Sequence, residues 1–347
     1  MNSFEIGHST VWFQAWRVNV GRTVLYLLDT NIPENDQHFQ SLTSHVYGGD
    51  VDTRIGQEIV LGIGGVRFLR SIDVDPVVYH MNEGHSAFLV LELLRERILE
   101  GTSAGEAAGQ VRQKCVFTTH TPVPAGHDRF SSELMQHALG KFWGSTGLSH
   151  DELMNFGRVN PGDGQEPFTM TVLALRMSRS ANGVSALHGQ VSREMWKELY
   201  PNIPVDNVPV GSITNGVHTP SWATARAHEF WNKRLGFDWT LELMEPKFWE
   251  GMEVNGLATD EELWAYRYTL RRELIEFVRQ RVREQYQRWG GDGPPTLERL
   301  LNPDALTICF ARRFATYKRA PLLFRNFERI LPLFNDPERP LQNVFAG

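Results

Sequence analysis

Pro76-Val77-Val78-Tyr79-His80-Met81 and Cys115-Val116-Phe117-Thr118 decide the fold, because each is a strand-like apolar run that stops at a polar loop. The first run leads into Asn82-Glu83-Gly84-His85, and the second leads into Thr119-His120-Thr121-Pro122. Between them, Ser86 is placed to cap a helix. This strand-helix-strand order predicts a parallel crossover, the unit from which doubly wound α/β sheets are assembled.

Another strand-like run, Leu306-Thr307-Ile308-Cys309-Phe310-Ala311, is followed closely by the cations Arg312, Arg313, Lys318 and Arg319. The apolar, partly β-branched run predicts a buried parallel strand, whose carboxyl end opens into the crevice where α/β sheets bind ligands. Guanidinium forks and an ammonium group suit phosphate. The alternative is a solvated surface that only aids solubility. The aromatic and small residues among the charges favour an anion pocket.

Size and composition bound the kind of protein. At 347 residues the chain is long enough for two α/β domains. A net charge of -6 argues against nucleic acid or an anionic membrane as the main partner. The two cysteines, Cys115 and Cys309, lie far apart in apolar runs, which disfavours a disulfide framework or a metal cluster. With no basic leader and no apolar stretch of membrane-spanning length, the sequence predicts a cytoplasmic protein.

Breaker residues indicate where one domain gives way to another. The turn from Ile213 to Pro220 contains Asn-Gly and Pro, so the predicted domains are 1–213 and 214–347. A capping box at Thr259-Asp260-Glu261-Glu262 predicts a helix running to about Trp289. In the helical pattern from Arg54 to Ile72, the run Gly62-Ile63-Gly64-Gly65 predicts close helix packing, since a dinucleotide site would need a strand before these glycines.

Four polar clusters, residues 80–85, 118–121, 214–218 and 312–319, lie at predicted strand ends or at the domain boundary. They could therefore converge on one cleft. The spacing of His80 and His85 does not match a zinc motif, so no metal is predicted. Nucleophile-elbow and phosphate-loop motifs are absent from the sequence. Acids such as Asp50, Glu58 and Glu83 leave a glycosidase open, because a sequence cannot fix the separation of two carboxylates.

Five motifs in this order resemble the α-glucan phosphorylases, the family of glycogen, starch and maltodextrin phosphorylases, and most closely its shorter bacterial branch. The motifs are Val78 to His85, Phe117 to Pro122, Asn182 to His188, Thr214 to Val217, and Arg312-Arg313 with Tyr317-Lys318-Arg319. The resemblance implies the two-lobed GT-B glycosyltransferase fold of paired Rossmann-like domains, incomplete at both ends. Residues 1–213 would form part of the amino-terminal, glucan-binding lobe. Residues 214–347 would begin the carboxyl-terminal lobe, on the phosphate and cofactor side.

The activity implied by this resemblance is reversible phosphorolysis of α-1,4-glucan by inorganic phosphate. It releases glucose 1-phosphate with retention and uses pyridoxal 5'-phosphate as cofactor. Arg313 and Lys318 would hold the substrate phosphate, while Arg312 would face the cofactor phosphate. His120 and Asn215 would contact the sugar at the cleaved bond. Substrate-binding roles are implied for Glu83, His85, Thr121, Tyr317 and Asp50, the last in a gate that begins at Tyr47.

The resemblance covers only the middle of the family's sequence. The lysine that binds the cofactor's aldehyde is expected to lie outside this chain, because no lysine here has its small-residue setting. We therefore expect the isolated chain to be inactive. Two alternatives stay open: a nucleotide-sugar-dependent glucan synthase of the same fold, and a non-catalytic glucan-binding protein. The sequence leaves glucan length, regulation and a homo-oligomeric state undecided.

Overall fold

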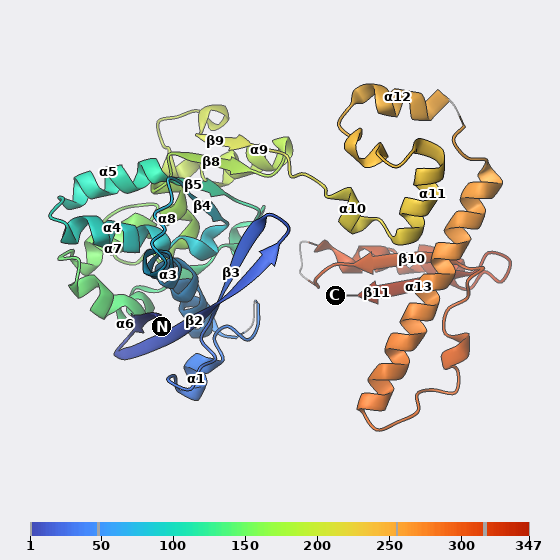
Figure 1. Ribbon diagram of the computed structural model, residues 1–347, viewed down its shortest axis with the longest axis horizontal. Coiled ribbons are helices and arrows are strands. Elements are labelled where there is room, and N and C mark those ends of the chain that lie inside the picture. Colours follow the sequence, from blue (N-terminus) through green and yellow to red (C-terminus); the bar gives the residue numbers. More distant parts are fainter. Residues whose placement is uncertain (1, 47–48, 255, 315–317, 347) are drawn as a thin grey trace. The chain divides into compact units, whose positions relative to one another are not determined.

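The computed structural model describes residues 2–46, 49–254, 256–314 and 318–346 (Figure 1). Contacts within the chain divide it into two compact units, Met1–Asn215 and Gly216–Gly347. The domain boundary predicted from the sequence lies between residues 213 and 214. The roles that the resemblance gives to the two sides stay predictions.

A four-stranded parallel sheet with the order β4-β5-β8-β9 forms the centre of the first unit. Its strands are β4 (Tyr79–Asn82), β5 (Cys115–Thr118), β8 (Ser180–Gly183) and β9 (Val210–Ser212). In the register, Tyr79 pairs with Cys115 and Phe117 pairs with Ala181. Because all four strands run the same way, their carboxyl ends lie at one edge. The predicted α/β class with a parallel sheet is confirmed.

Antiparallel strands and helices complete the first unit (Figure 1). One sheet joins β1 (Asn2–Ile6), β2 (Ser9–Val20) and β3 (Thr23–Asp29), and another joins β6 (Arg129–Phe130) and β7 (Phe168–Thr169). The α-helices are α1 (Gln37–Gln40), α2 (Val51–Ile59), α3 (Gly65–Ser71), α4 (Leu89–Leu99), α5 (Ala104–Lys114), α6 (Ser132–Gly144), α7 (His150–Gly157), α8 (Met170–Arg176) and α9 (Ala186–Met195).

The crossover from β4 to β5 contains α4 and α5, as the strand-helix-strand order predicts. Its beginning differs from the prediction. Ser86 does not cap the helix but lies in a 3-10 turn, Gly84–Ser86, and α4 starts after Phe88 with no side-chain cap. Glu83 and Gly84 turn the chain immediately after β4, so the long helix begins only once that turn is complete. Ser103 caps α5 by accepting a hydrogen bond from the backbone N–H of Glu106.

Helices α2 and α3 are joined by a π-helical segment, Val60–Gly64. The prediction that its glycines serve close helix packing holds at Gly62. A Cβ atom there would lie 2.7 Å from the backbone nitrogen of Leu89 and 2.8 Å from the Cβ of Phe88. Gly65, three residues on, has nothing within 4 Å of the same position. Gly62 therefore lets the start of α4 approach this helix, whereas Gly65 has no such role.

Replacing Gly62 with alanine should destabilise the first unit by about 1–3 kcal/mol, because the added methyl group meets backbone rather than a movable side chain. Gly65→Ala is the matched control and should be neutral or stabilising by up to about 1 kcal/mol through helix propensity. Urea denaturation of both variants, followed by far-UV circular dichroism, measures the difference. Equal stability of the two variants would contradict the packing role of Gly62.

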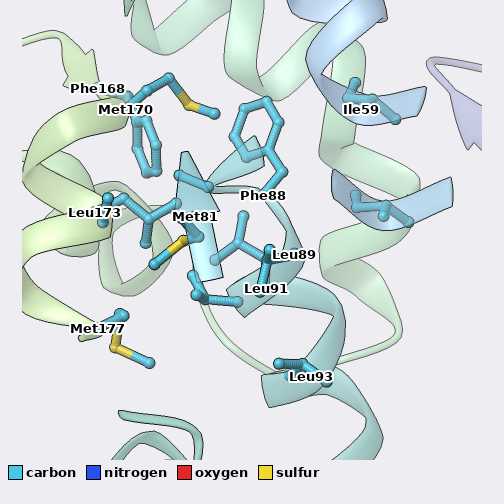
Figure 2. Packing of buried hydrophobic residues seen from close by; sticks show 14 of the residues in the cluster. Ile59, Met81, Phe88, Leu89, Leu91, Leu93, Phe168, Met170, Leu173 and Met177 are labelled. Carbon is cyan, nitrogen blue, oxygen red and sulfur yellow. The ribbon is translucent and has the colours of Figure 1, made fainter. Parts of the chain in front are cut away.

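The core of the first unit lies between the central sheet and its helices (Figure 2). Met81 of β4 is completely buried and lies among the side chains of α4 and α8, including Leu89, Leu91 and Leu173 (Figure 2). Every second residue of β4 is buried, and His80 and Asn82 are exposed between them. The apolar residues of the strand therefore anchor it, while its polar residues remain accessible at the sheet edge.

The second unit is mainly helical. Its helices are α10 (Thr219–Trp222), α11 (Ala225–Leu235), α12 (Pro246–Val254), α13 (Asp260–Arg288) and α14 (Phe327–Phe334). The predicted capping box is confirmed, since Thr259 and Glu262 bond reciprocally at the start of α13. This helix has 29 residues and ends next to Trp289, as predicted. Among the described residues, no helix is long and apolar enough to span a membrane.

The strand predicted before the cation cluster forms as β10 (Leu306–Ala311) and pairs in parallel with β11 (Leu341–Ala346). Its predicted burial is wrong. Leu306 is 63% exposed and Ile308 is 39% exposed. Side chains project from the faces of a sheet, and those of β10 are not part of the packed core that buries Cys115 and Phe117 of β5. The hydrophobic pattern identified the strand and its direction but not its surroundings.

Candidate functional site

Hydrogen bonds between loops tie the carboxyl edge of the central sheet together. The backbone N–H of Glu83, after β4, donates to the carbonyl of Thr118 at 2.8 Å, and that of Thr119, after β5, donates to the carbonyl of Asn182 at 3.0 Å. The N–H of Asn215, after β9, donates to the carbonyl of Val184 at 3.1 Å. Loops that follow four strands therefore share one edge. The clusters at 80–85 and 118–121 and the start of the one at 214–218 meet there.

Glu83 is the centre of this arrangement. Its side chain is buried, and its carboxylate accepts hydrogen bonds from the backbone N–H of His120 at 2.7 Å and the hydroxyl of Thr121 at 2.9 Å. The hydroxyl of Thr119 and the N–H of Gly84 donate to the other oxygen, each at 3.3 Å. The backbone of Glu83 has a φ of 67°, a left-handed conformation that is strained for this residue type.

These contacts define what Glu83 does. With both oxygens occupied by protein donors, its carboxylate is an anchor for the loop that follows β5. Glu83 and Thr121, both predicted to bind substrate, contact each other here, and their substrate contacts stay predictions. His120 is exposed at the tip of the loop, so the anchor leaves its imidazole accessible.

A polar chain along the sheet edge links β4, β5 and β8. The imidazole of His80 lies 2.8 Å from the hydroxyl of Thr118, and that hydroxyl donates to the side-chain oxygen of Asn182 at 3.1 Å. The side-chain nitrogen of Asn182 donates in turn to the carbonyl of Gly183 at 3.1 Å. A Cβ at Gly183 would lie 2.8 Å from a ring nitrogen of His188, so only glycine lets the His188 side chain of α9 lie this close to the end of β8.

A second polar cluster surrounds His85, two residues beyond Glu83. The Nδ1 atom of His85 lies 3.2 Å from a carboxylate oxygen of Asp128 and 3.4 Å from one of Glu58. The guanidinium of Arg54 contacts the same imidazole and lies 3.1 Å from Asp128 and 3.3 Å from Glu58. Arg54 and Glu58 lie one turn apart on α2, and Asp128 precedes β6. Three separate segments of the first unit therefore meet at one imidazole.

In this cluster the pKa values of Glu58 and His85 are raised and the pKa of Asp128 is lowered. Burial raises the pKa of Glu58 to about 8. Burial alone would lower the pKa of His85, but hydrogen bonds to Asp128 and Glu58 outweigh it and raise that pKa to about 9. For Asp128, the hydrogen bonds from His85 and Arg54 outweigh burial and hold the carboxyl pKa well below its usual range. His85 and Asp128 thus form an ion pair at neutral pH.

This cluster has the composition of a metal site, because ligand atoms of Glu58, His85 and Asp128 all lie within 4.8 Å of one another. Arg54, however, places a permanent positive charge against all three. A divalent cation would have to displace the guanidinium and separate it from two carboxylates. The geometry favours an ion-pair network held by Arg54.

Asp50, predicted to bind substrate, is the N-cap of α2. Its carboxylate accepts a hydrogen bond from the N–H of Thr53 at 2.9 Å, and this bond lowers the pKa of Asp50. Capping is a sufficient structural role for Asp50. A contact between Asp50 and substrate would be a second role beside it. The predicted residue Tyr317, and Tyr47 at the start of the predicted gate, fall outside the described residues.

The predicted phosphate ligands lie in the second unit. Arg312 and Arg313 directly follow β10 and are exposed, and the N–H of Arg312 donates to the carbonyl of Ala346 at 3.0 Å. Lys318 is half-buried. The two arginines therefore lie at the carboxyl end of a parallel strand, as the sequence predicts.

Sequence reasoning missed Arg54 and Asp128, and it considered Glu58 only as a generic acid. The sequence does contain a signal for the contact between Arg54 and Glu58, since an arginine and a glutamate four residues apart on a helix are neighbours. Asp128 lies 43 residues from its partner His85, in a loop without periodicity. No spacing rule could have joined them.

Fold and site together define an α/β protein with a parallel sheet, whose carboxyl edge gathers polar loops around an accessible histidine. No family model matches the chain. Similar proteins do exist. A maltodextrin phosphorylase of Thermococcus litoralis is 42% identical over 97% of the chain. Proteins named glycogen phosphorylase from Mycobacterium tuberculosis and Aquifex aeolicus are 40% and 34% identical over 96% and 97% of it.

By sequence, the chain is thus related to the α-glucan phosphorylases over nearly its whole length. The resemblance predicted from its five motifs is confirmed. The chain spans 39% of the length of the Thermococcus and Mycobacterium proteins and 48% of the Aquifex protein. It therefore matches a part of each relative.

Proposed function

We propose that this chain is part of an α-glucan phosphorylase, which cleaves α-1,4-glucan with inorganic phosphate and releases glucose 1-phosphate with retention. The observation that carries the proposal is the match of almost the entire chain to proteins named as such phosphorylases. The structure adds support, because His120 and Asn215, implied to contact the sugar, both lie in loops at one sheet edge. The proposed fold is the two-lobed GT-B arrangement of Rossmann-like domains.

In this proposal, the glucan lies over the carboxyl edge of the first unit. His120 faces the sugar at the cleaved bond, and its backbone carbonyl points toward the positive charge that develops on the ring. The side chain of Asn215 hydrogen-bonds the same sugar. Glu83 acts indirectly, because its carboxylate fixes the backbone of His120. Such fixed dipoles stabilise a transition state without the cost of reorienting water.

Phosphate is assigned to the cations of the second unit. Arg313 and Lys318 hold the attacking phosphate, since several fixed positive charges are needed where two phosphate groups approach each other. Arg312 is assigned to the phosphate of pyridoxal 5'-phosphate, and Tyr317 to the pocket wall. The exposure of both arginines at the end of β10 supports this assignment.

The residues present do not fit the aldehyde end of pyridoxal 5'-phosphate. All the lysines fall in the described part of the chain, and none of them is buried. Lys114 and Lys233 pair with surface carboxylates, and Lys197 donates to two backbone carbonyls. An aldehyde-binding lysine needs a shielded pocket in which its amine loses its proton. No step is assigned to the cofactor here.

The proposal is tested by measuring whether glucan cleavage depends on phosphate in the complete protein that contains this sequence. Maltoheptaose with inorganic phosphate and added pyridoxal 5'-phosphate should yield glucose 1-phosphate, with no product when phosphate is left out. Chain growth from a sugar nucleotide would instead establish the glucan synthase. Binding of maltoheptaose without turnover in either assay would establish the non-catalytic glucan-binding protein.

A further inference from the structure

The turn from Glu83 to Ser86 is held from both sides. On one side, Glu83 accepts hydrogen bonds from the loop that carries His120. On the other side, His85 contacts α2 through Arg54 and Glu58 and contacts the segment before β6 through Asp128. The turn therefore links the catalytic loop proposed above to α2 and to the segment before β6.

The protonation state of His85 decides which of these contacts can form. A neutral imidazole can accept a hydrogen bond from Arg54 at Nδ1, whereas a protonated one donates from Nδ1 to Asp128 or Glu58. Among the described residues, the titratable and charged groups that contact His85 include Arg54 and Glu58 from α2 and Asp128 from the segment before β6. Helix α8, which packs against the turn, contributes Met170 and Thr171 next to Gly84, and neither carries a charge.

Glu58 is the buried member of the cluster. Its side chain is 1% exposed, and one of its oxygens lies toward His85 and Arg54. The other oxygen is buried without a hydrogen-bond partner among the described residues. With its pKa raised by burial to about 8, Glu58 is mostly protonated at neutral pH, so it contributes hydrogen bonds to the cluster rather than a charge. Its contacts assign it to the imidazole and the guanidinium.

We propose that Glu58 and Asp128 are positioning residues that clamp protonated His85, while Arg54 pairs with both of them, and that this clamp fixes the turn that anchors the His120 loop. The clamp is a property of the first unit alone. Its effect on glucan use rests on the proposed function, whereas its effect on His85 and on the His120 loop does not.

The pH dependence of the clamp follows from the pKa shifts. The pKa of His85 is raised from 6.5 to about 9, so its contribution to folding is complete below pH 6.5 and is lost as the pH rises through about 9. Glu58 changes in the same direction, from 4.5 to about 8. The lowered pKa of Asp128 makes its contribution complete above pH 3.8 and lost in acid. The clamp should therefore weaken between neutral pH and about pH 9.

Histidine titration by nuclear magnetic resonance tests the clamp directly. In the full chain labelled with 15N-histidine, the His85 signal, assigned with His85→Gln, should titrate well above the ordinary range. In Asp128→Asn and Glu58→Gln it should titrate at least about one pH unit lower, which corresponds to a tenfold change in proton affinity. Asp128→Glu, which keeps the charge, should restore most of the shift.

The matched control is Glu92→Gln. Glu92 is another carboxylate of the first unit with a 1% exposed side chain, and it pairs with Arg67 and Arg95, away from His85. This variant should destabilise the unit but leave the titration of His85 unchanged. The clamp is overturned if His85 titrates in its ordinary range in the wild type, or if Asp128→Asn and Glu58→Gln both give the same value as the wild type.

Hydrogen exchange shows whether the clamp reaches the loop. The backbone N–H of His120 should exchange roughly tenfold faster in Asp128→Asn than in the wild type at the same pH, relative to an amide of β5. It should keep its relative protection in Glu92→Gln. Unchanged relative protection of His120 in both Asp128→Asn and Glu58→Gln would overturn the positioning role, even if the titration had shifted.

Maltoheptaose binding separates this inference from the proposed function. Calorimetry on the same chain should give a dissociation constant that rises roughly tenfold between pH 7 and pH 9.5, with the rise shifted to lower pH in Asp128→Asn. No binding at any pH would count against the proposed glucan site and leave the clamp to the titration and exchange results. Binding that is independent of pH, with His85 titrating as expected, would overturn the link between clamp and sugar.

Discussion

Replacing Glu83 with alanine should cause the largest loss of any single change in the first unit. Four donors would lose their acceptor: two backbone N–H groups, of His120 and Gly84, and two threonine hydroxyls. Buried donors without a partner cost on the order of 1–3 kcal/mol each, with water or rearrangement recovering part. We expect the unit to lose about 3 kcal/mol or more of unfolding free energy, measured by urea denaturation.

Two further variants separate anchoring from a general loss of stability. Glu83→Gln keeps the size of the side chain and one acceptor oxygen, so it should lose less stability than Glu83→Ala. Glu92→Ala removes another buried carboxylate and should destabilise the unit, while the N–H of His120 keeps its protection from hydrogen exchange relative to β5. If Glu83→Ala also leaves that relative protection intact, Glu83 does not anchor the loop.

Arg313→Ala should have the largest effect on catalysis by the complete protein that carries this chain. A charge-assisted bond to phosphate is worth a few kcal/mol in a shielded site, so use of phosphate should weaken roughly a hundredfold. The affinity for maltoheptaose should barely change, because the sugar is assigned to loops of the first unit. Initial rates of glucose 1-phosphate release at varied phosphate, together with calorimetry for the glucan, measure the two effects separately.

The control for this prediction is Arg299→Ala, which removes another exposed arginine from the same unit. It should leave the use of phosphate within about twofold of the wild type, since surface charges contribute little at a distance in salt. Equal weakening by the two substitutions would indicate a diffuse charge effect. Parallel losses of phosphate use and glucan binding in Arg313→Ala would point to misfolding.

Much of the fold could be predicted because the chain carries local signals. The apolar runs before residues 82 and 119 predicted parallel strands, and both form. The capping box at Thr259 predicted where α13 begins. Ser86 misled, because a capping residue is a signal only where a helix follows directly, and here a 3-10 turn intervenes. The burial of β10 also could not be predicted, since it depends on what covers the strand.

For the candidate site, the sequence located the loops but did not reveal the contacts that each side chain makes. It could place Glu83, His85 and His120 after strands, since strand ends are visible in the hydrophobic pattern. The sequence could not show that the carboxylate of Glu83 accepts hydrogen bonds from four donors in two turns. Nor could it find Asp128, because a partner 43 residues away is chosen by the folded chain rather than by spacing.

The sequence by itself therefore determined the strands, their polar ends and the relation to α-glucan phosphorylases, because each of these rests on residue types in a fixed local order. Only the tertiary structure decided which polar groups are accessible and which are occupied. Glu83 holds the backbone of His120 while the side chain of His120 is exposed, and His85 gains its charge because Asp128 and Glu58 meet it, despite the guanidinium of Arg54. Electrostatic interactions depend on distance and burial, and both are set when segments far apart in the sequence pack together.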